Sequence, residues 1–551
     1  MNWILGLIFI LLSFFLIAQY YRKKRTEKLR EFLIKNWGKP RKDDFFNFYN
    51  ISRYFENNFH KKEAYHSISD ATKEDVDLED LFKFVDRTTS KIGQQYLYYK
   101  LRTIGGREEL MEFGALSDLF LKDPSLRLES QWILSVLKTE EAYDLELLIN
   151  GEPLKKPRYF KFIYASSIAS VICLGLVFVS PIFSLFLLPL FCVNTVFHFK
   201  NKDNINYYIN GVSQLTKALK VCKKLLSFQE LKAQFEEVSF VSHVQKIQLK
   251  TEFIKFEKAL SSEYVALFWL PLEIIKIQFN LELLVFYSFI EDITKEKQHI
   301  DNLFQFIGKV DVAISAASVR SGKLETCRPV FVSEKHVMVS GIVHPLVDKC
   351  VDNKLNLEGE SLLLTGSNMS GKSTFIRTMA LNSILAQTLY FCFAKSYQAP
   401  FFKLHSSIRV TDDLSEKTSY YLQEVLAIKK LLQASKSKDP CLFILDEIFK
   451  GTNTVERVAA GKAILSFLTK GNHTVLVSTH DIELTELLAE EHYKLHHFSE
   501  QIENETLFFD HKLKEGKLTT RNAIKVLELY EYPDIIIKEA RKVERDCFGG
   551  I

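Results

Sequence analysis

Residues 361–374 read Ser-Leu-Leu-Leu-Thr-Gly-Ser-Asn-Met-Ser-Gly-Lys-Ser-Thr. The apolar start is typical of a buried strand, and the segment 366–373 fits the pattern G-x-x-x-x-G-K-[ST], with a helix-like stretch after it. In such a strand–loop–helix unit, glycines let backbone N–H groups turn toward a phosphate, and the helix N-terminus adds a favourable dipole. The stretch therefore predicts a phosphate-binding loop within an α/β domain.

This loop gives residue-level predictions. Lys372 is expected to reach the β and γ phosphates of ATP, and the hydroxyl of Ser373 is expected to bind Mg²⁺. ATP and Mg²⁺ are thus the expected cofactors. The predicted nucleotide-binding set is the loop together with the next residue: Gly366, Ser367, Asn368, Met369, Ser370, Gly371, Lys372, Ser373 and Thr374.

Two further apolar runs supply the other half of such a site. Residues 441–445 are followed by Asp446 and Glu447, and residues 474–478 are followed by Thr479 and His480. Asp446 is expected to hold Mg²⁺ through its water shell, and Glu447 to orient or deprotonate the attacking water. A histidine in the place of His480 can contact the γ-phosphate and sense its loss. The predicted catalytic residues are Lys372, Glu447 and His480, and the predicted metal ligands are Ser373 and Asp446.

The pattern changes along the chain at about residue 325. From there, short apolar runs alternate with helical segments over 325–551, which is typical of a parallel sheet. Upstream, residues 81–160 and 200–324 have helical periodicity and few breakers. We therefore predict a multidomain protein with a mostly α-helical region before the α/β domain, and a polar N-terminal region over 22–80.

Two uncharged apolar stretches predict membrane segments. Residues 3–21 approach the ~20 residues of a spanning helix, and the Arg and Lys residues that follow favour an uncleaved anchor over 1–21 with Met1 outside. A signal peptide is the alternative, but its positive charge would come before the apolar core. Residues 162–197 are too long for one span, and Ser180-Pro181 supplies a break, so 161–199 is predicted as a transmembrane hairpin.

The alternative for this second stretch is a buried hairpin of a soluble protein. Residues 264–289 are also apolar but contain Glu273, Lys276 and Glu282. Charges near the centre of a span are costly, so we expect this helix to lie against protein or at an interface. Three spans with the cationic flanks on one side predict a multi-pass protein of the cytoplasmic membrane, with its ATPase domain in the cytoplasm.

Composition limits the function classes only weakly. The chain has 551 residues, 47% of them hydrophobic and 25% charged, which suits several folded domains. A net charge of +4 is too small to indicate a nucleic-acid partner by itself. None of the eight cysteines forms a C-x-x-C pair, so a reducing compartment is expected and a zinc site has little support.

The motifs together resemble the MutS family, within the broader ABC-type ATPases. Residues 365–374 are similar to its T-G-x-N-M-x-G-K-S-T, and residues 446–454 resemble its D-E-x-x-R-G-T-S-T. Residues 407–414 resemble R-I-G-A-x-D-D-L, and residues 419–424 align with S-T-F-x-x-E. The resemblance implies a P-loop ATPase of the ABC type that acts as a dimer with composite ATP sites.

The resemblance also assigns two residues that no local chemistry would single out. It implies that Ser419 reaches the γ-phosphate bound by the partner of a homodimer, and that His511 packs on the adenine. In the helical region, residues 86–93 resemble D-x-T-x-T-x-x-G, residues 144–146 resemble D-L-E-R, and Asp311-Val-Ala also fits the family.

The chain departs from the family before residue 86. About 80 residues cannot contain the mismatch-reading and connector domains that soluble mismatch-repair members have there. The hairpin 161–199 also begins where the family continues into its levers and DNA clamp. The leading hypothesis is therefore a membrane-anchored ATPase that changes conformation on DNA. The alternatives are an ATP-driven membrane process without DNA, and a scaffold whose ATP site gates partner binding.

Overall fold

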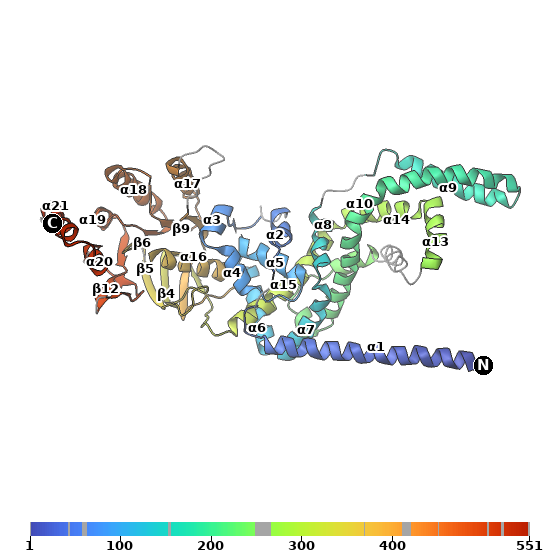
Figure 1. The fold of residues 1–551 in the computed structure, drawn as a ribbon, viewed down its shortest axis with the longest axis horizontal. Coiled ribbons are helices and arrows are strands. Elements are labelled where there is room, and N and C mark those ends of the chain that lie inside the picture. Colours follow the sequence, from blue (N-terminus) through green and yellow to red (C-terminus); the bar gives the residue numbers. More distant parts are fainter. Residues whose placement is uncertain are drawn as a thin grey trace. The chain divides into compact units, whose positions relative to one another are not determined.

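The protein is described by a computed structural model that covers residues 2–41, 45–57, 63–151, 156–247, 266–367, 370–409, 420–449, 451–503, 506–518 and 523–548. Its packing divides the chain into two compact units (Figure 1). The first, here called the helical unit, comprises Met1–His60, Val85–Tyr99 and Glu112–Ser321. The second, here called the sheet unit, comprises Lys61–Phe84, Lys100–Met111 and Gly322–Ile551. A mostly helical N-terminal region followed by an α/β region was predicted, and that coarse order is confirmed.

The helical unit is built from long helices with short 3-10 turns between some of them. Three further helices, α4 (Leu78–Val85), α5 (Lys91–Arg102) and α6 (Arg107–Lys122), cross the boundaries given above. The other described elements are α1 (Asn2–Lys35), α2 (Phe48–Asn57), α7 (Pro124–Leu134), η2 (Ser135–Leu137), η3 (Glu140–Asp144), α8 (Leu145–Asn150), α9 (Phe160–Val177), η4 (Pro181–Phe183), α10 (Ser184–Leu225), α11 (Gln229–Lys232), α13 (Ala266–Gln278), α14 (Leu281–Lys295) and α15 (Lys297–Arg320).

Helix α15 forms the centre of this unit, and almost all of its residues after Ile300 are buried. The buried Asp311 carboxylate accepts hydrogen bonds from the backbone N–H groups of Thr89 and Ser90, at 2.8 and 2.7 Å, and from the Ser90 hydroxyl. Gly93 faces the same carboxylate so closely that a Cβ atom there would lie 2.2 Å from Asp311 Oδ2. Two motifs far apart in sequence thus meet in one contact.

The 144–146 motif also makes a structural contact. Glu146 is fully buried and pairs with Arg53 of α2, whose Nη2 lies 3.0 Å from Glu146 Oε2. Asn57 donates to the other carboxylate oxygen at 3.1 Å. Because a buried carboxylate is stable only when paired and hydrogen-bonded, these two side chains fix α2 against α8.

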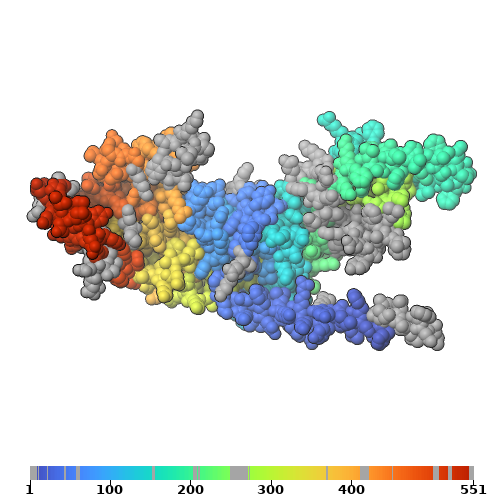
Figure 2. Space-filling model, in the orientation of Figure 1, coloured from blue at the N-terminus to red at the C-terminus, as the bar shows by residue number. Residues whose placement is uncertain are grey.

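The predicted hairpin is present as two helices with a break where Ser180-Pro181 predicted one. Among the described residues, Phe160–Val177 and Pro181–Lys202 are long and apolar enough to cross a membrane, and only 17% and 11% of these stretches are buried. The green atoms of Figure 2 show the hairpin as a projection of the helical unit.

A third span at residues 3–21 is not supported by the described residues. That run is helical, but α1 continues from it without interruption through the cationic residues to Lys35. The end of this helix and the residues after it are held by α7, through an ion pair of Arg30 with Glu129 and through the Arg127 guanidinium, 3.8 Å from the Trp37 ring centre. Two helices among the described residues thus meet the criteria for a span, and the anchor over 1–21 stays a prediction.

The charged apolar stretch around residue 276 packs against protein, one of the two outcomes predicted. It forms two helices, α13 and α14, and both contact α10. Asn280, with φ 47°, makes the turn between them. Its side-chain amide donates to Ser167 at 3.1 Å and to Asn194 at 2.8 Å, so the break is fixed by polar contacts with α9 and α10.

The sheet unit contains a six-stranded sheet in the order β14-β11-β6-β10-β9-β8. The strands from β11 to β8 are parallel, and β14 pairs antiparallel with β11. These elements are β6 (Ser361–Thr365), α16 (Lys372–Thr388), β8 (Lys403–Ser407), α17 (Tyr420–Ala434), β9 (Cys441–Asp446), α18 (Thr454–Leu468), β10 (Thr474–Ser478), α19 (Glu483–Leu487), β11 (Tyr493–His497) and β14 (Lys514–Glu515). Strands β6 and β10 are buried at every position, as expected for continuous apolar runs in a parallel sheet.

Smaller elements complete this unit. A four-stranded sheet has the order β3-β7-β4-β5, and β12 pairs with β13. Two helices, α20 and α21, follow at the C-terminal end (Figure 1). The bounds are β3 (Val330–Val332), β4 (His336–Ile342), β5 (Asn353–Glu358), β7 (Ser396–Pro400), β12 (Glu500–Glu503), β13 (Thr506–Phe509), α20 (Ala523–Leu529) and α21 (Asp534–Phe548).

The last division between the compact units, at Ser321 and Gly322, lies close to the predicted boundary at 324, but residues 61–84 and 100–111 belong to the sheet unit. Strands β1 (His66–Ser67) and β2 (Thr103–Ile104) pair with each other inside the sheet unit. Helix α3 (Asp70–Asp75) begins after Ser69, whose side chain accepts the Thr72 N–H, and it packs on β8. These contacts place part of the predicted 22–80 and 81–160 regions with the α/β domain.

Candidate functional site

The phosphate loop begins at the carboxyl end of β6, in the interior of the sheet. Gly366 has φ 145° and Gly371 has φ 112°, and both conformations favour glycine. A Cβ atom on Gly366 would lie 2.8 Å from the carbonyl oxygen of Phe498, so the loop also needs glycine for close packing. After Gly371, α16 begins with Lys372, so the N-terminus of this helix adjoins the end of the loop. Such a concave backbone at a helix N-terminus can hold a phosphate.

The Lys372 side chain folds back over this loop. Its Nζ donates to the carbonyl oxygens of Gly366 and Ser367, at 2.7 and 2.8 Å, and lies 3.2 Å from Nε2 of His480. Lys372 is only 3% exposed. The ammonium group is therefore positioned at the mouth of the loop, where an anionic ligand would meet it.

Two carboxylates lie at the carboxyl end of β9, the strand that pairs with β10. Asp446 ends β9, and the Ser478 hydroxyl of β10 donates to its Oδ1. Glu447 follows with φ 62°, a conformation that costs a non-glycine residue about 1–3 kcal/mol. Its N–H donates to the carbonyl oxygen of Ser478 at 2.9 Å, which helps to hold the strained backbone. Carboxylates placed here could hold a divalent cation and a water molecule.

His480 joins the lysine to the second carboxylate. Its Nε2 lies 3.2 Å from Glu447 Oε1 and also 3.2 Å from Lys372 Nζ. Burial, and then the positive charge of Lys372, lower the pKa of His480 below its usual value, while Glu447 raises it less. The imidazole is therefore neutral at neutral pH and can accept a hydrogen bond from the lysine or share a proton with the glutamate.

A cavity of about 410 Å³ adjoins the other side of the loop. Residues 371–374 line it, together with Phe498, Asn353 and His511. His511 Nδ1 lies 3.0 Å from the carbonyl oxygen of Ser370, and Asn353 donates to the His511 carbonyl at 3.1 Å. The histidine that resemblance alone singled out is therefore at the loop, beside a cavity that could take a flat ring.

The structure brings together most of the predicted site residues. His480 contacts both Lys372 and Glu447, and Asp446 precedes Glu447 at the end of β9. Ser373 and His511 line the cavity on the other side of the loop. Three predicted residues, Asn368, Met369 and Ser419, lie outside the described residues.

Other residues that support the site were not predicted. Ser478 positions Asp446 and Glu447, and the buried Glu424 of α17 accepts the Gly451 N–H at 3.3 Å. Arg457 pairs with Asp481 just after His480, with Nη2 and Oδ1 2.6 Å apart. The alignment of residues 419–424 with a family motif could have indicated Glu424, whereas nothing local marks Ser478 or the Arg457–Asp481 pair.

Comparison with known proteins relates this part of the chain to one family. The model of the family MutS domain V matches residues 362–547. The DNA mismatch repair protein MutS of Thermotoga maritima is 32% identical over 280 residues, which are 48% of this chain and 34% of that protein. The MutS proteins of Bacillus cytotoxicus and Bacillus pumilus are 32% and 35% identical, over 48% and 43% of this chain and 30% and 29% of theirs.

The chain thus spans about a third of the length of the curated relatives it matches. The matched part contains β6, the phosphate loop, α16, β9 and β10, which carry the residues described above. This C-terminal part of the chain is therefore similar to the ATPase region of MutS proteins.

Proposed function

We propose that the protein is a Mg²⁺-dependent ATP hydrolase of the MutS type that works on DNA and is anchored in a membrane. The observation that carries the ATPase part is that His480 contacts both Lys372 of the loop and Glu447 at the end of β9. The loop would bind the phosphates, and Ser373 and Asp446 would hold Mg²⁺. Glu447 would act on the attacking water, with the neutral His480 between it and Lys372.

The relatives support DNA as the substrate. They are named DNA mismatch repair proteins, and the matched region is their domain V. In the proposal, two chains form composite ATP sites with Ser419 reaching the partner's γ-phosphate, and His511 packs on the adenine. ATP binding then closes the dimer, hydrolysis reopens it, and the helical unit transmits the motion. Mismatch specificity is not part of the proposal.

The exposed apolar hairpin supports the membrane part. Outward-facing residues of α9 and α10 such as Phe178, Leu185 and Leu188 are 91%, 71% and 70% exposed. A protein in water rarely leaves so large an apolar surface uncovered. We place the hairpin in the cytoplasmic membrane, with the sheet unit in the cytoplasm, and assign α1 as a further anchor because its apolar residues Phe9 and Phe14 are also exposed.

The test is the rate of ATP hydrolysis by the full chain in detergent, with Mg²⁺, measured alone and with duplex, mismatched or branched DNA. The proposal predicts Mg²⁺-dependent turnover and salt-dependent stimulation by at least one DNA. Lys372→Ala is the control for contaminating ATPases, because it removes the ammonium group from the loop. Turnover that no DNA changes at low salt would exclude the DNA part and leave the ATPase part standing.

That last result would favour a second function. The exposed hairpin is the observation that supports this second function. An ATPase with a membrane element can couple ATP turnover to a membrane process without DNA. It can also use ATP to control the binding of a protein partner. The two functions differ in the ligand that changes the ATPase rate. Stimulation by lipid vesicles but by none of the DNAs would select the second.

A further inference from the structure

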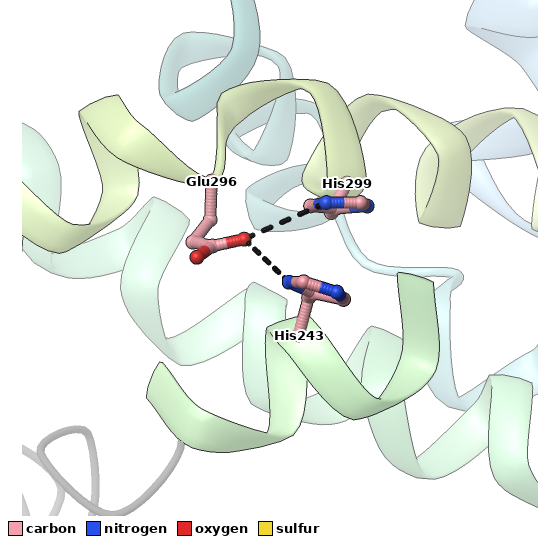
Figure 3. Close-up of side chains that lie close together, drawn as sticks. All are labelled: His243, Glu296 and His299. Carbon is pink, nitrogen blue, oxygen red and sulfur yellow. Dashed lines mark hydrogen bonds and ion pairs between the residues drawn. The ribbon is translucent and has the colours of Figure 1, made fainter. Parts of the chain in front are cut away.

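A cluster of metal-binding side chain types lies in the helical unit. His243 belongs to the helical residues 240–247, Glu296 lies between α14 and α15, and His299 is in the first turn of α15. Their nitrogen and oxygen ligand atoms all lie within 4.8 Å of one another. Figure 3 shows both rings turned toward the same oxygen of Glu296. The three groups therefore converge on one point.

The separations suit a small divalent ion. Glu296 Oε2 is 3.1 Å from His243 Nδ1 and 3.7 Å from His299 Nε2. Two ligand atoms bound tetrahedrally to Zn²⁺ at about 2.1 Å lie about 3.4 Å apart. The two distances bracket this value, so the ligand atoms lie close enough to bind one ion once the side chain of a histidine has turned.

The two imidazole rings lie face to face. They are stacked, with centroids 3.9 Å apart and planes at 17°. A metal ion lies in the plane of each imidazole that binds it, so one ring has to turn out of this stack for both to bind one ion. The neutral imidazole is the form that binds a metal ion.

The backbone holds the three residues before any ion arrives. The Glu296 carbonyl accepts the N–H of His299 at 2.9 Å, so these two residues share one rigid turn. Segment 240–247 is anchored by Phe240 and Val244, which are 4% and 1% exposed. Their burial leaves His243 on the partly exposed side, where an ion can enter from solvent.

We propose that His243, Glu296 and His299 form a binding site for a divalent transition metal, with Zn²⁺ as the best fit. Imidazole nitrogens select such ions over Mg²⁺ and Ca²⁺, which prefer oxygen ligands. Two nitrogens and one carboxylate oxygen supply three of the four zinc positions and leave one for water. The ion would fasten segment 240–247 to the junction of α14 and α15. No cysteine pair takes part, which is why the cysteine pattern did not indicate this site.

The experiment measures zinc binding by the full chain. The protein is first stripped of metal with a chelator and is then kept in excess Mg²⁺ without ATP. Zn²⁺ is titrated in competition with a chromophoric chelator. The proposal predicts one tight zinc equivalent per chain, which His243→Gln and His299→Gln each weaken at least about tenfold. It also predicts that Zn²⁺ raises the melting temperature of the wild type more than that of His243→Gln.

Two control variants make the result specific. His336→Gln removes a histidine of the sheet unit and should leave the zinc equivalent unchanged. His198→Gln removes the histidine of the other described grouping, in which His198 lies near Glu273 and Glu282. The proposal is overturned if the wild type binds no tight zinc, if all variants bind it equally, or if His198→Gln alone loses it.

Discussion

At the scale of single residues, the positions of the candidate catalytic side chains could be predicted because they follow from strand ends. Lys372, Asp446, Glu447 and His480 each come directly after a strand or loop of recognisable pattern, and parallel strands bring their carboxyl ends to one edge. What they contact could not be predicted. The hydrogen bond of Ser478 to Asp446 depends on the register of β9 and β10, which no local sequence signal states.

The contact of Gly93 with Asp311 can be tested by a substitution that adds a single methyl group to Gly93. Gly93→Ala places a Cβ atom 2.2 Å from Asp311 Oδ2, and Asp311 cannot move away without losing its bonds to Thr89 and Ser90. Overpacking of this kind costs about 1–3 kcal/mol or more. Thermal unfolding of the full chain should show a lower melting temperature for Gly93→Ala.

The matched control is Gly106→Ala, because nothing lies within 4 Å of a Cβ atom added there. This variant should stay within about half a kcal/mol of the wild type. Equal melting temperatures for the two variants would show that the close approach of Gly93 to Asp311 is not present in solution.

Buried histidines make the sheet unit sensitive to acid. Burial lowers the pKa of His66 to about 4 and that of His405 to about 3, and their rings lie 4.9 Å apart. In the unfolded chain both titrate near ~6.5. Between these values the unfolded state binds protons that the folded state does not, so stability falls as the pH decreases from about 6.5 toward 4.

His405→Phe removes one of these protons and keeps a ring against Phe443. The melting temperature of this variant should fall less steeply from pH 6.5 to pH 4 than that of the wild type. His336→Phe, outside the cluster, should keep the wild-type slope. An unchanged slope in His405→Phe would mean that this histidine does not titrate differently in the folded and unfolded states.

At the scale of elements, breaks marked by proline were predictable and breaks made by tertiary contacts were not. Ser180-Pro181 indicated the hairpin, and α9 ends before it at Val177. The break between α13 and α14 has no glycine or proline. It rests on Asn280, whose left-handed conformation is held by side chains of α9 and α10. Such a turn depends on the side chains that contact Asn280, so the local sequence predicted one continuous helix.

Helix α3 is tied to β8 by one buried carboxylate. Asp75 accepts the Ser406 hydroxyl at 2.6 Å and the N–H groups of Ile408 and Arg409 at 3.0 and 2.7 Å. Asp75→Ala leaves these three donors unpaired, and we expect a loss of about 2–4 kcal/mol of stability.

Thermal unfolding checks this expectation, with Asp80→Ala as the control. Asp80 is exposed and pairs with the exposed Lys83, so its loss should change stability by less than about 1 kcal/mol. If Asp75→Ala were as mild as Asp80→Ala, α3 would not be fastened to β8 as described.

The proposed membrane hairpin can be tested by introducing charged side chains into its two helices. Ile168 of α9 and Val193 of α10 are 44% and 46% exposed on apolar helices. In a membrane, each change to Arg near the middle of a span costs about 2.5–3.5 kcal/mol. Ile168→Arg combined with Val193→Arg should reduce the fraction of the chain in alkali-washed membranes.

A chain with Met111→Arg and Val136→Arg is the matched control, since these residues are 59% and 51% exposed on other helices. It should remain in the membrane fraction like the wild type. Membrane retention that the hairpin arginines leave unchanged would assign the exposed apolar surface to a protein partner.

At the scale of the whole molecule, the order of helical and α/β parts followed from the change of period near residue 325. The sequence pattern did not indicate that residues 61–84 and 100–111 belong to the sheet unit. Their membership depends on the pairing of β1 with β2 and on Asp75, which are contacts between segments separated by up to 334 positions. Patterns within a window of sequence cannot report such contacts.

The central claim is that the C-terminal part hydrolyses ATP with Glu447 acting on water and Lys372 holding the phosphates. The most direct measurement is the comparison of ATP binding and ATP turnover by Glu447→Gln in the full chain. The account predicts that this variant binds ATP with Mg²⁺ as tightly as the wild type and turns it over at least about a hundred times more slowly. Turnover at the wild-type rate, with contaminating activity excluded by Lys372→Ala, would contradict the account.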